Sequence, residues 1–213
     1  CLLSRGLGDV YKRQAEDCVK VADFSSFETS GRYKVVVNGI PSSPFFDIKN
    51  RVHEDLSKAS IKYYYYNRSS TPINEAYAGG WERSEGHPDD VVYVHESAAS
   101  EERPEGTILS SSKGWYDAGD YNKYIVNSGI TTYTLLALYE RFWKMYDDIN
   151  LNIPESNNNI PDILDEAKWN LDWMLSMQDP NDGGVYFKLT SKDFTWNITV
   201  SYTHLRAHET RGN

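Results

Sequence analysis

Gly114-Trp115-Tyr116-Asp117-Ala118-Gly119-Asp120-Tyr121-Asn122-Lys123-Tyr124 is the stretch that says most about how this chain folds. Within it, Asp117 and Asp120 lie three residues apart around Gly119, and a long apolar segment follows from Ile125 to Met145. On a turn that leads into a helix, residues i and i+3 point the same way, and glycine permits a sharp bend. The stretch therefore predicts a helix start that presents two carboxylates together.

Two close carboxylates among aromatic rings suit glycoside hydrolysis, in which a carboxylate base works beside a separate carboxylic acid. Spacing alone leaves two alternatives open. Asp at a helix N-terminus commonly caps free backbone amides. A calcium loop of the EF-hand type needs oxygen ligands at alternate positions, and Ala118 and Gly119 interrupt that pattern.

The run KGWYDAGDYNKYIVNSGIT, from Lys113 to Thr131, resembles the signature of glycoside hydrolase family 9, the inverting cellulases and related β-glucanases. Further matching blocks flank it in the same order, His87–Thr107 before it and Ile160–Thr190 after it. Upstream, Asp23–Gly39 resembles the end of the immunoglobulin-like domain that precedes many of these catalytic domains. The resemblance extends over Glu16–Val200.

The resemblance implies a mainly α fold, a partial (α/α)6 barrel preceded by the C-terminal strands of an immunoglobulin-like β-sandwich. Residues 15–49 are expected to be the sandwich remnant, and residues 50–200 the N-terminal part of the catalytic domain. Residues 1–14 and 201–213 resemble translated sequencing-adapter sequence and are expected to be non-native tails. The chain is accordingly expected to be a fragment of a longer protein.

Carried over residue by residue, the resemblance makes Asp120 the general base and Asp117 the partner that holds the attacking water. The family's acid, a Glu far downstream, has no match here, so the fragment itself is expected to be inactive. Trp115, Tyr116 and Tyr121 are candidate sugar contacts, with core packing as the alternative for each.

No metal ligand is assigned, and His87 and His95 are expected to be structural. Phe187 stands where many relatives have His.

The implied function is inverting hydrolysis of β-1,4-glucosidic bonds in cellulose or a related β-glucan by a monomeric, secreted or periplasmic endoglucanase. No cofactor is required, although a full-length protein could carry structural calcium. The alternative is a non-catalytic carbohydrate-binding α/α toroid.

Composition fits a neutral polysaccharide partner. The net charge of −9 disfavours nucleic acid and anionic membranes as partners. No apolar run approaches the roughly 20 residues of a membrane span. Two Cys are too few for a disulfide framework or a zinc cluster.

Hydrophobic patterns place the remaining elements. A hairpin is predicted from strands at Tyr33–Val37 and Phe45–Ile48 around Asn38-Gly39. Residues 71–112 show little periodicity and are expected to be a long loop. Residues 185–189 read as extended.

Three helices are predicted. The first follows Arg51 with an apolar stripe of Val52, Leu56, Ala59, Tyr63 and Tyr66; the second covers residues 121–146; the third starts at Pro161 with a stripe of Ile163, Ala167, Leu171, Met174 and Leu175.

Overall fold

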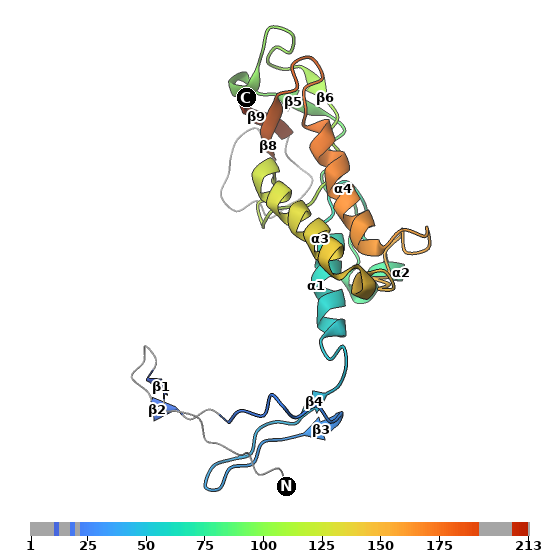
Figure 1. Cartoon of the computed structure of the whole chain (residues 1–213). Helices are drawn as coiled ribbons and strands as arrows, with labels where there is room; N and C mark the ends of the chain where they lie inside the picture. The colour runs from blue at the N-terminus through green and yellow to red at the C-terminus, as the bar shows by residue number, and fades with distance from the viewer. Residues whose placement is uncertain (1–10, 13–17, 20–21, 192–205, 213) are drawn as a thin grey trace. The chain divides into compact units, whose positions relative to one another are not determined.

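The computed structural model describes residues 11–12, 18–19, 22–191 and 206–212 of the 213-residue chain, with side chains over 22–191 (Figure 1). The chain divides into two compact units, Cys1–Asp55 and Leu56–Asn213.

The first unit contains two small antiparallel ribbons. Strand β1 (Tyr11–Lys12) pairs with β2 (Cys18–Val19), and β3 (Gly31–Tyr33) pairs with β4 (Phe46–Ile48). The predicted hairpin is therefore present, but its first strand ends at Tyr33, where the prediction had it begin. Among the described residues, no second sheet packs over the segment after Tyr33. Val36 and Val37 in that segment are exposed. The immunoglobulin-like origin of this unit stays a prediction.

Three longer helices and several short elements build the second unit. The long helices are α1 (Glu54–Tyr66), α3 (Ile125–Tyr146) and α4 (Asp162–Ser176), and α3 packs against α4. The predicted loop over residues 71–112 instead contains α2 (Glu75–Ala78), the 3-10 turns η1 (Gly79–Trp81) and η2 (Glu96–Ala98), and strands β5 (Val92–Val94) and β6 (Ile108–Leu109).

A five-stranded sheet, which the sequence did not predict, has the order β6-β5-β9-β8-β7. Strands β7 (Lys123–Tyr124) and β9 (Arg206–Gly212) lie on either side of β8 (Val185–Ser191). Only the β5–β9 pair is parallel. Strand β8 confirms the predicted extended segment. Strand β9 falls in the segment expected to be a non-native tail, and that expectation stays untested.

Helix α3 begins at Ile125, four residues later than predicted, because Lys123 and Tyr124 pair with β8. Phe142 interrupts its helical backbone with φ −129° and ψ 29°.

The buried face of α1 also differs from the prediction. Ile61 and Tyr65 are buried, whereas Leu56 and Tyr63 of the predicted stripe are 64% and 60% exposed. Every second or third residue of α1 is apolar or aromatic, so periodicity alone does not select one face.

Helix α4 follows Pro161 and begins at Asp162. Ile163 and Ala167 of its predicted stripe are buried, but Leu171 and Leu175 are exposed. Polar residues take their place on the buried face: Glu166 and Asn170 are fully enclosed. The prediction failed there because the partners of these polar groups come from distant segments.

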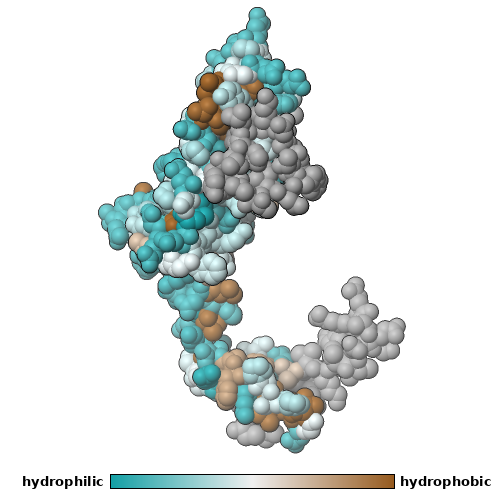
Figure 2. All heavy atoms as spheres, turned by 180° about the vertical axis from the view of Figure 1, so that it is seen from behind, coloured by the Kyte–Doolittle hydropathy of each residue, from teal (hydrophilic) through white to brown (hydrophobic). Residues whose placement is uncertain are grey.

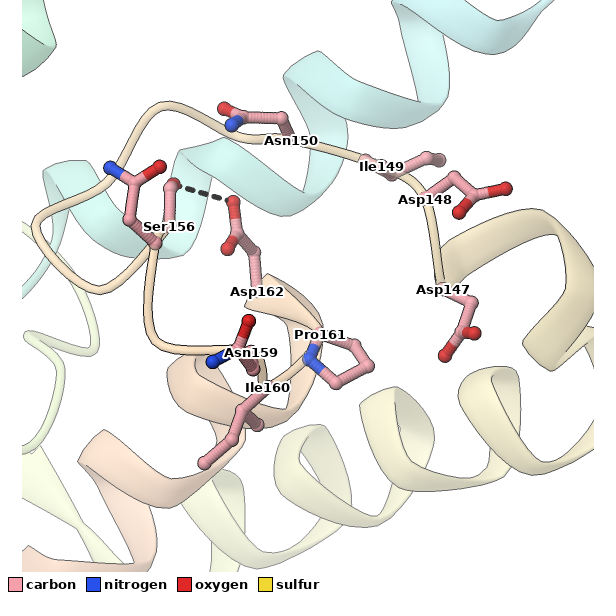
Figure 3. A pocket seen from close by; sticks show the side chains of 10 residues that line it. Asp147, Asp148, Ile149, Asn150, Ser156, Asn159, Ile160, Pro161 and Asp162 are labelled. Atoms are coloured by element: carbon pink, nitrogen blue, oxygen red, sulfur yellow. Dashed lines mark hydrogen bonds between the residues drawn. The ribbon is translucent and has the colours of Figure 1, made fainter.

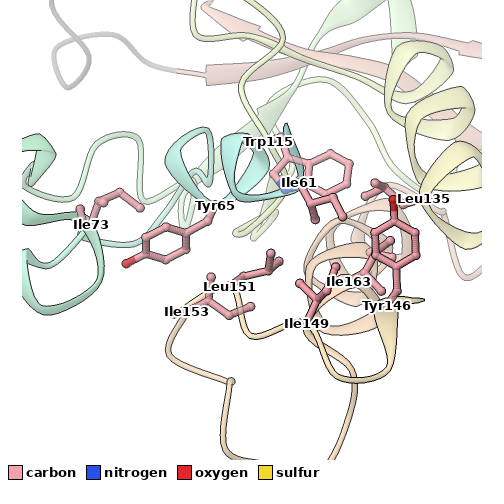
Figure 4. Close-up of a cluster of buried hydrophobic side chains, with 12 residues drawn as sticks. Ile61, Tyr65, Ile73, Trp115, Leu135, Tyr146, Ile149, Leu151, Ile153 and Ile163 are labelled. Atoms are coloured by element: carbon pink, nitrogen blue, oxygen red, sulfur yellow. The ribbon is translucent and has the colours of Figure 1, made fainter. Parts of the chain in front are cut away.

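Two clusters of buried side chains form the core of the second unit. The larger joins α1, α3, α4 and the α3–α4 connector (Figure 4), and comprises Ile61, Tyr65, Ile73, Ala78, Trp115, Leu135, Tyr146, Ile149, Leu151, Ile153, Ile163 and Ala167. The smaller lies between α4 and the sheet, and comprises Val92, Val94, Ala98, Trp173, Met177, Tyr186 and Leu189.

Part of the apolar surface stays uncovered among the described residues. Val126, Ile130 and Tyr133, at helical spacing on α3, are each more than 60% exposed. On the face seen in Figure 2, hydrophilic side chains dominate and hydrophobic ones gather in separate patches. No described helix is long and apolar enough to cross a membrane.

Candidate active site

The segment that leads to the two carboxylates is held against the end of α1. The Ser69 backbone N–H donates to Gly114 O at 2.8 Å, and the Tyr116 N–H donates to Asn67 O at 2.9 Å. Gly114 has φ +80°, and an added Cβ would lie 2.8 Å from the Trp173 ring. Only glycine fits this position without a shift of the backbone or of α4.

The carboxylates themselves lie in a tight loop before β7. The Asp117 N–H donates to Asn122 O at 2.9 Å, and the Tyr121 N–H donates to Ala118 O at 3.1 Å. The left-handed residue of this loop is Tyr121, with φ +56°. Gly119 has no positive φ, and an added Cβ would meet no atom within 4 Å. The prediction that Gly119 permits the bend is therefore wrong, and its surroundings are open instead.

Neither carboxylate caps a helix. The N-cap of α3 is Tyr124, and no side chain accepts a capping hydrogen bond there. The prediction of a direct helix start is wrong for the same reason that α3 begins late: β7 intervenes between the loop and the helix. Asp117 is exposed and Asp120 is half-buried, so the capping alternative does not account for either residue.

Asp120 uses its two oxygens unequally. Oδ2 accepts from Asn122 Nδ2 at 2.9 Å and from the Tyr124 hydroxyl at 3.0 Å. Oδ1 accepts only the Asn122 backbone N–H, at 3.2 Å, among the described residues. Since each carboxylate oxygen has about two acceptor positions, Oδ2 is fully used and Oδ1 keeps one acceptor position.

Asp117 also keeps unused acceptor capacity. Its Oδ1 accepts from Asn127 Nδ2 at 2.8 Å, and its Oδ2 has no partner among the residues that the structure describes. In that same part of the chain, no cation lies within ion-pair distance of either Asp117 or Asp120. Two carboxylates with free lone pairs thus lie on one loop. Among the described residues, only neutral groups donate hydrogen bonds to them.

The three candidate sugar-contact residues lie in different environments. Trp115 is 5% exposed in the larger core cluster, where its indole N–H donates to Glu166 Oε1 at 2.7 Å. Tyr116 is buried, and its hydroxyl donates to Gly86 O at 2.8 Å. Tyr121 is half-buried and stacks on His87 with 5.7 Å between ring centroids. The placement of Trp115 supports core packing, whereas Tyr121, next to Asp120 in the chain, is only partly buried.

A buried ion pair anchors the N-terminal side of the loop. Arg68, 1% exposed, meets Glu166 with 2.9 Å between Nη2 and Oε2, and its Nη1 lies 3.0 Å from Glu155 Oε1. Burial raises the pKa of the Glu166 carboxyl, and Arg68 together with the Trp115 N–H opposes that rise. Because Trp115 binds the same carboxylate, this network fixes the residue two positions before Asp117.

A second buried ion pair anchors the C-terminal side. Lys123 Nζ lies 2.7 Å from Asp89 Oδ2, and both side chains are fully buried. The ammonium also donates to Ser111 O at 2.9 Å and to Lys113 O at 2.7 Å. Two segments, one with Asp89 and one with Ser111 and Lys113, are therefore tied to the residue three positions after Asp120.

Sequence reasoning missed the residues of both anchors and the donors to Asp120. Asn122, Lys123 and Tyr124 stood within the quoted stretch, so their nearness was visible although their roles were not. Glu166 gave a weaker signal, since it lies three residues after Ile163 on the face that was expected to be apolar. Arg68 gave none.

Two surface hollows occur elsewhere. One of about 480 Å³ lies where the α3–α4 connector meets α4 (Figure 3), and is lined by Asp147, Asp148, Ile149, Asn150, Ser156, Asn157, Asn159, Ile160, Pro161 and Asp162. There Asp162 Oδ2 accepts from the Leu151 N–H and the Ser156 hydroxyl. Asp162 therefore holds the α3–α4 connector through these two hydrogen bonds.

The other hollow, of about 590 Å³, is lined by Ile125, Val126 and residues 182–187. Its Phe187 ring packs edge-on against Tyr124, with 6.3 Å between centroids, so it adjoins a residue that binds Asp120.

Among the described residues, no three His, Cys, Asp or Glu side chains are grouped to hold a metal ion. His87 is buried against Tyr116 and Tyr121. His95 Nδ1 lies 2.9 Å from the Ser97 hydroxyl and accepts the Ser97 N–H. Both histidines thus have structural contacts.

A half-exposed carboxylate with one free acceptor position, beside a second carboxylate, can take a proton from a bound water. Such an arrangement is chemically suited to a hydrolase. Comparison with known proteins agrees, because residues 53–207 match glycosyl hydrolase family 9. The chain belongs to this family.

Similar proteins include two named as endoglucanases. The chain is 56% identical over 172 residues to a xyloglucan-specific endo-beta-1,4-glucanase of Bacteroides ovatus, covering 81% of this chain and 29% of that protein. It is 35% identical over 197 residues to endoglucanase D of Acetivibrio thermocellus, covering 92% of this chain and 31% of the relative.

Solved structures agree with these relatives. The fold is similar to that of a Bacteroides ovatus family 9 protein, with a TM-score of 0.82 and 43% identity over 96% of this chain and 41% of that one. It is also similar to a metagenome-derived family 9 endoglucanase, with a TM-score of 0.80 and 33% identity. The chain thus spans less than half the length of the relatives it matches.

Proposed function

We propose that the protein hydrolyses β-1,4-glucosidic bonds of a β-glucan with inversion, and that Asp120 is the general base. The observation that carries this proposal is the acceptor position left on Asp120 Oδ1, in a family 9 chain whose relatives are named as endoglucanases. In the proposed step, Oδ1 takes one proton from a water. The water oxygen bonds to the anomeric carbon from the face opposite the leaving group.

Asp117 is proposed to hold the same water through its free Oδ2, and Tyr121 to contact the sugar ring. A carboxylic acid must protonate the departing oxygen, roughly 6.5–9.5 Å from the base in an inverting enzyme. No residue here is assigned to that role. We infer that it belongs to the remainder of an (α/α)6 barrel, for which the uncovered apolar stripe of α3 provides a packing surface. Action on a polymer too large to be taken up further supports a location outside the cytoplasm.

The test uses the protein produced from its complete open reading frame. Asp120→Asn should lower reducing-sugar release from soluble β-glucan by about 10²-fold or more, while glucan binding persists. Asp148→Asn, an exposed Asp of the α3–α4 connector, is the matched control and should retain wild-type activity. The first sugar released should be the α-anomer, as inversion of a β-linkage requires.

Three outcomes would overturn the assignment: wild-type activity in Asp120→Asn, a β-anomeric product, or binding without any hydrolysis by the wild type. The last would identify a carbohydrate-binding protein. Xyloglucan, carboxymethyl-cellulose and mixed-linkage glucan tested in parallel would rank the substrates. The 213-residue chain alone is assayed as an additional sample. It should release little sugar, because no catalytic acid is assigned within it.

A further inference from the structure

The donors that bind Asp120 form a closed triangle. Asn122 Nδ2 donates to Asp120 Oδ2 at 2.9 Å and lies 3.3 Å from the Tyr124 hydroxyl oxygen. That hydroxyl in turn donates to the same Oδ2 at 3.0 Å. An amide group has two N–H donors, so Asn122 spends one on the carboxylate and one on the tyrosine.

The triangle is maintained at a cost. Asn122 is fully buried, and its Oδ1 has no hydrogen-bond partner among the described residues. A buried polar atom without a partner destabilises a fold and calls for an explanation. Turning the amide over would place its oxygen against Asp120 Oδ2, oxygen against oxygen. The observed orientation thus keeps a donor on Asp120 at the expense of the amide oxygen.

Tyr124 is kept as a donor by its surroundings. Burial raises the pKa of its hydroxyl, Asn122 opposes the rise, and the charges of Asp120 and Asp117 add to it. The hydroxyl therefore keeps its proton and directs it to Asp120. Tyr124 belongs to β7 and pairs with Lys188 of β8, and its ring lies edge-on to Phe187.

We propose that Asn122 and Tyr124 are positioning residues, which hold Asp120 through Oδ2 and leave Oδ1 directed to the attacking water. The inference rests on the proposed function of Asp120 as base. Two donors on one carboxylate oxygen fix the orientation of the other oxygen.

Other charged groups near the loop do not replace these donors. Asp117 lies on the same loop and carries the same charge. His87 contacts the rings of Tyr116 and Tyr121. The ammonium of Lys123 is directed into the core, towards Asp89.

The test substitutes Tyr124→Phe, which removes one hydroxyl, and measures kcat and KM separately for the protein from its complete open reading frame. The kcat should fall roughly tenfold, because Asp120 loses one of the two donors that orient its base oxygen. The KM should stay within about twofold of the wild-type value, because the lost hydroxyl holds the base and not the substrate.

Tyr139→Phe is the matched control. Tyr139 lies on α3, and its hydroxyl also donates to a carboxylate, Asp147 Oδ1 at 2.9 Å. This variant should leave kcat and KM unchanged. Urea unfolding of both variants separates a loss of folded protein from a change at the base.

A wild-type kcat in Tyr124→Phe overturns the inference, and so does a loss of kcat/KM that comes entirely from KM. An equal fall in kcat in Tyr139→Phe also overturns it. If Asp120→Asn is inactive while Tyr124→Phe keeps the wild-type kcat, the inference fails and the assignment of the base stands. If Asp120→Asn is active, the assignment itself has failed.

Discussion

The carboxylates of the second unit fall into two groups with opposite surroundings. Glu166 and Asp89 are enclosed in the core, and each meets a buried cation, Arg68 and Lys123 respectively. Asp117 and Asp120 lie on the loop between these two anchors and accept only neutral donors among the described residues. A buried charge needs a counter-charge to remain ionised. A carboxylate near solvent can do without one, and it then stays available for proton transfer.

Packing differs between the same two regions. At Gly114, on the N-terminal anchor, an added Cβ would collide with Trp173, whereas at Gly119, between the two carboxylates, it would meet nothing. The chain is therefore crowded at Gly114, and the loop has open space beside Gly119. Rigid support around an open site is what precise positioning of a water requires.

The largest expected effect comes from breaking a buried pair. Lys123→Met should destabilise the fold by about 3–5 kcal/mol, because Asp89 would lose its counter-charge in the core. Urea unfolding would measure this. Lys168→Met is the matched control: this lysine pairs with Asp172 at 2.7 Å but is 64% exposed, so its loss should cost less than about 1 kcal/mol. Equal effects in the two variants would contradict the distinction between the two groups.

The difference in packing can be tested with one substitution at two glycines. Gly114→Ala should destabilise by about 1–3 kcal/mol, because of its positive φ and the contact with Trp173. Gly119→Ala should change the free energy of unfolding by no more than about 0.5 kcal/mol. Thermal or urea unfolding of both variants gives the comparison, and a larger cost at Gly119 would show that the loop is not open.

The smallest effect concerns a surface ion pair and its pH dependence. Burial acts to raise the pKa of Asp172, but Lys113 and Lys168 outweigh it, and the pKa is lowered. A lowered carboxyl pKa gives stability that is present above the unfolded-state value, about 3.9, and is lost as pH falls through the folded-state value. Asp172→Asn should therefore cost about 0.2–1 kcal/mol at neutral pH.

Urea unfolding of Asp172→Asn and wild type at about pH 6 and about pH 3 measures that difference. It should shrink at the lower pH. A difference that grows on acidification would reverse the sign of the argument.

Several elements were predictable because their signals are local. Strand β8 follows from a short run of β-branched and aromatic residues, and α4 follows from Pro161 and an apolar repeat. In the first unit, β3 precedes the run Val35–Val37 on which the strand was predicted. The predictions failed where contacts between elements decide which side chains are buried. Leu56 and Tyr63 of α1 are exposed, since periodicity marks an apolar stripe without naming the face that meets the core.

The candidate site shows the same division. Asp117 and Asp120 were found from spacing and family resemblance, and the roles assigned to them stay predictions. The expectation that Gly119 makes the bend was wrong, because the backbone turns at Tyr121 instead. Trp115 was grouped with the sugar contacts because it adjoins the loop in sequence, yet its ring lies in the core.

By itself, the sequence determined the family, the position of the carboxylate pair, and the approximate extent of the helices, because each is written in consecutive residues. Tertiary structure decided which carboxylates meet a cation and which oxygen of Asp120 keeps an acceptor position. Arg68 and Glu166 are 98 positions apart in the chain. Ion pairs and hydrogen bonds act across a few ångströms of space, so a pair this distant in sequence becomes visible only when folding brings its partners together.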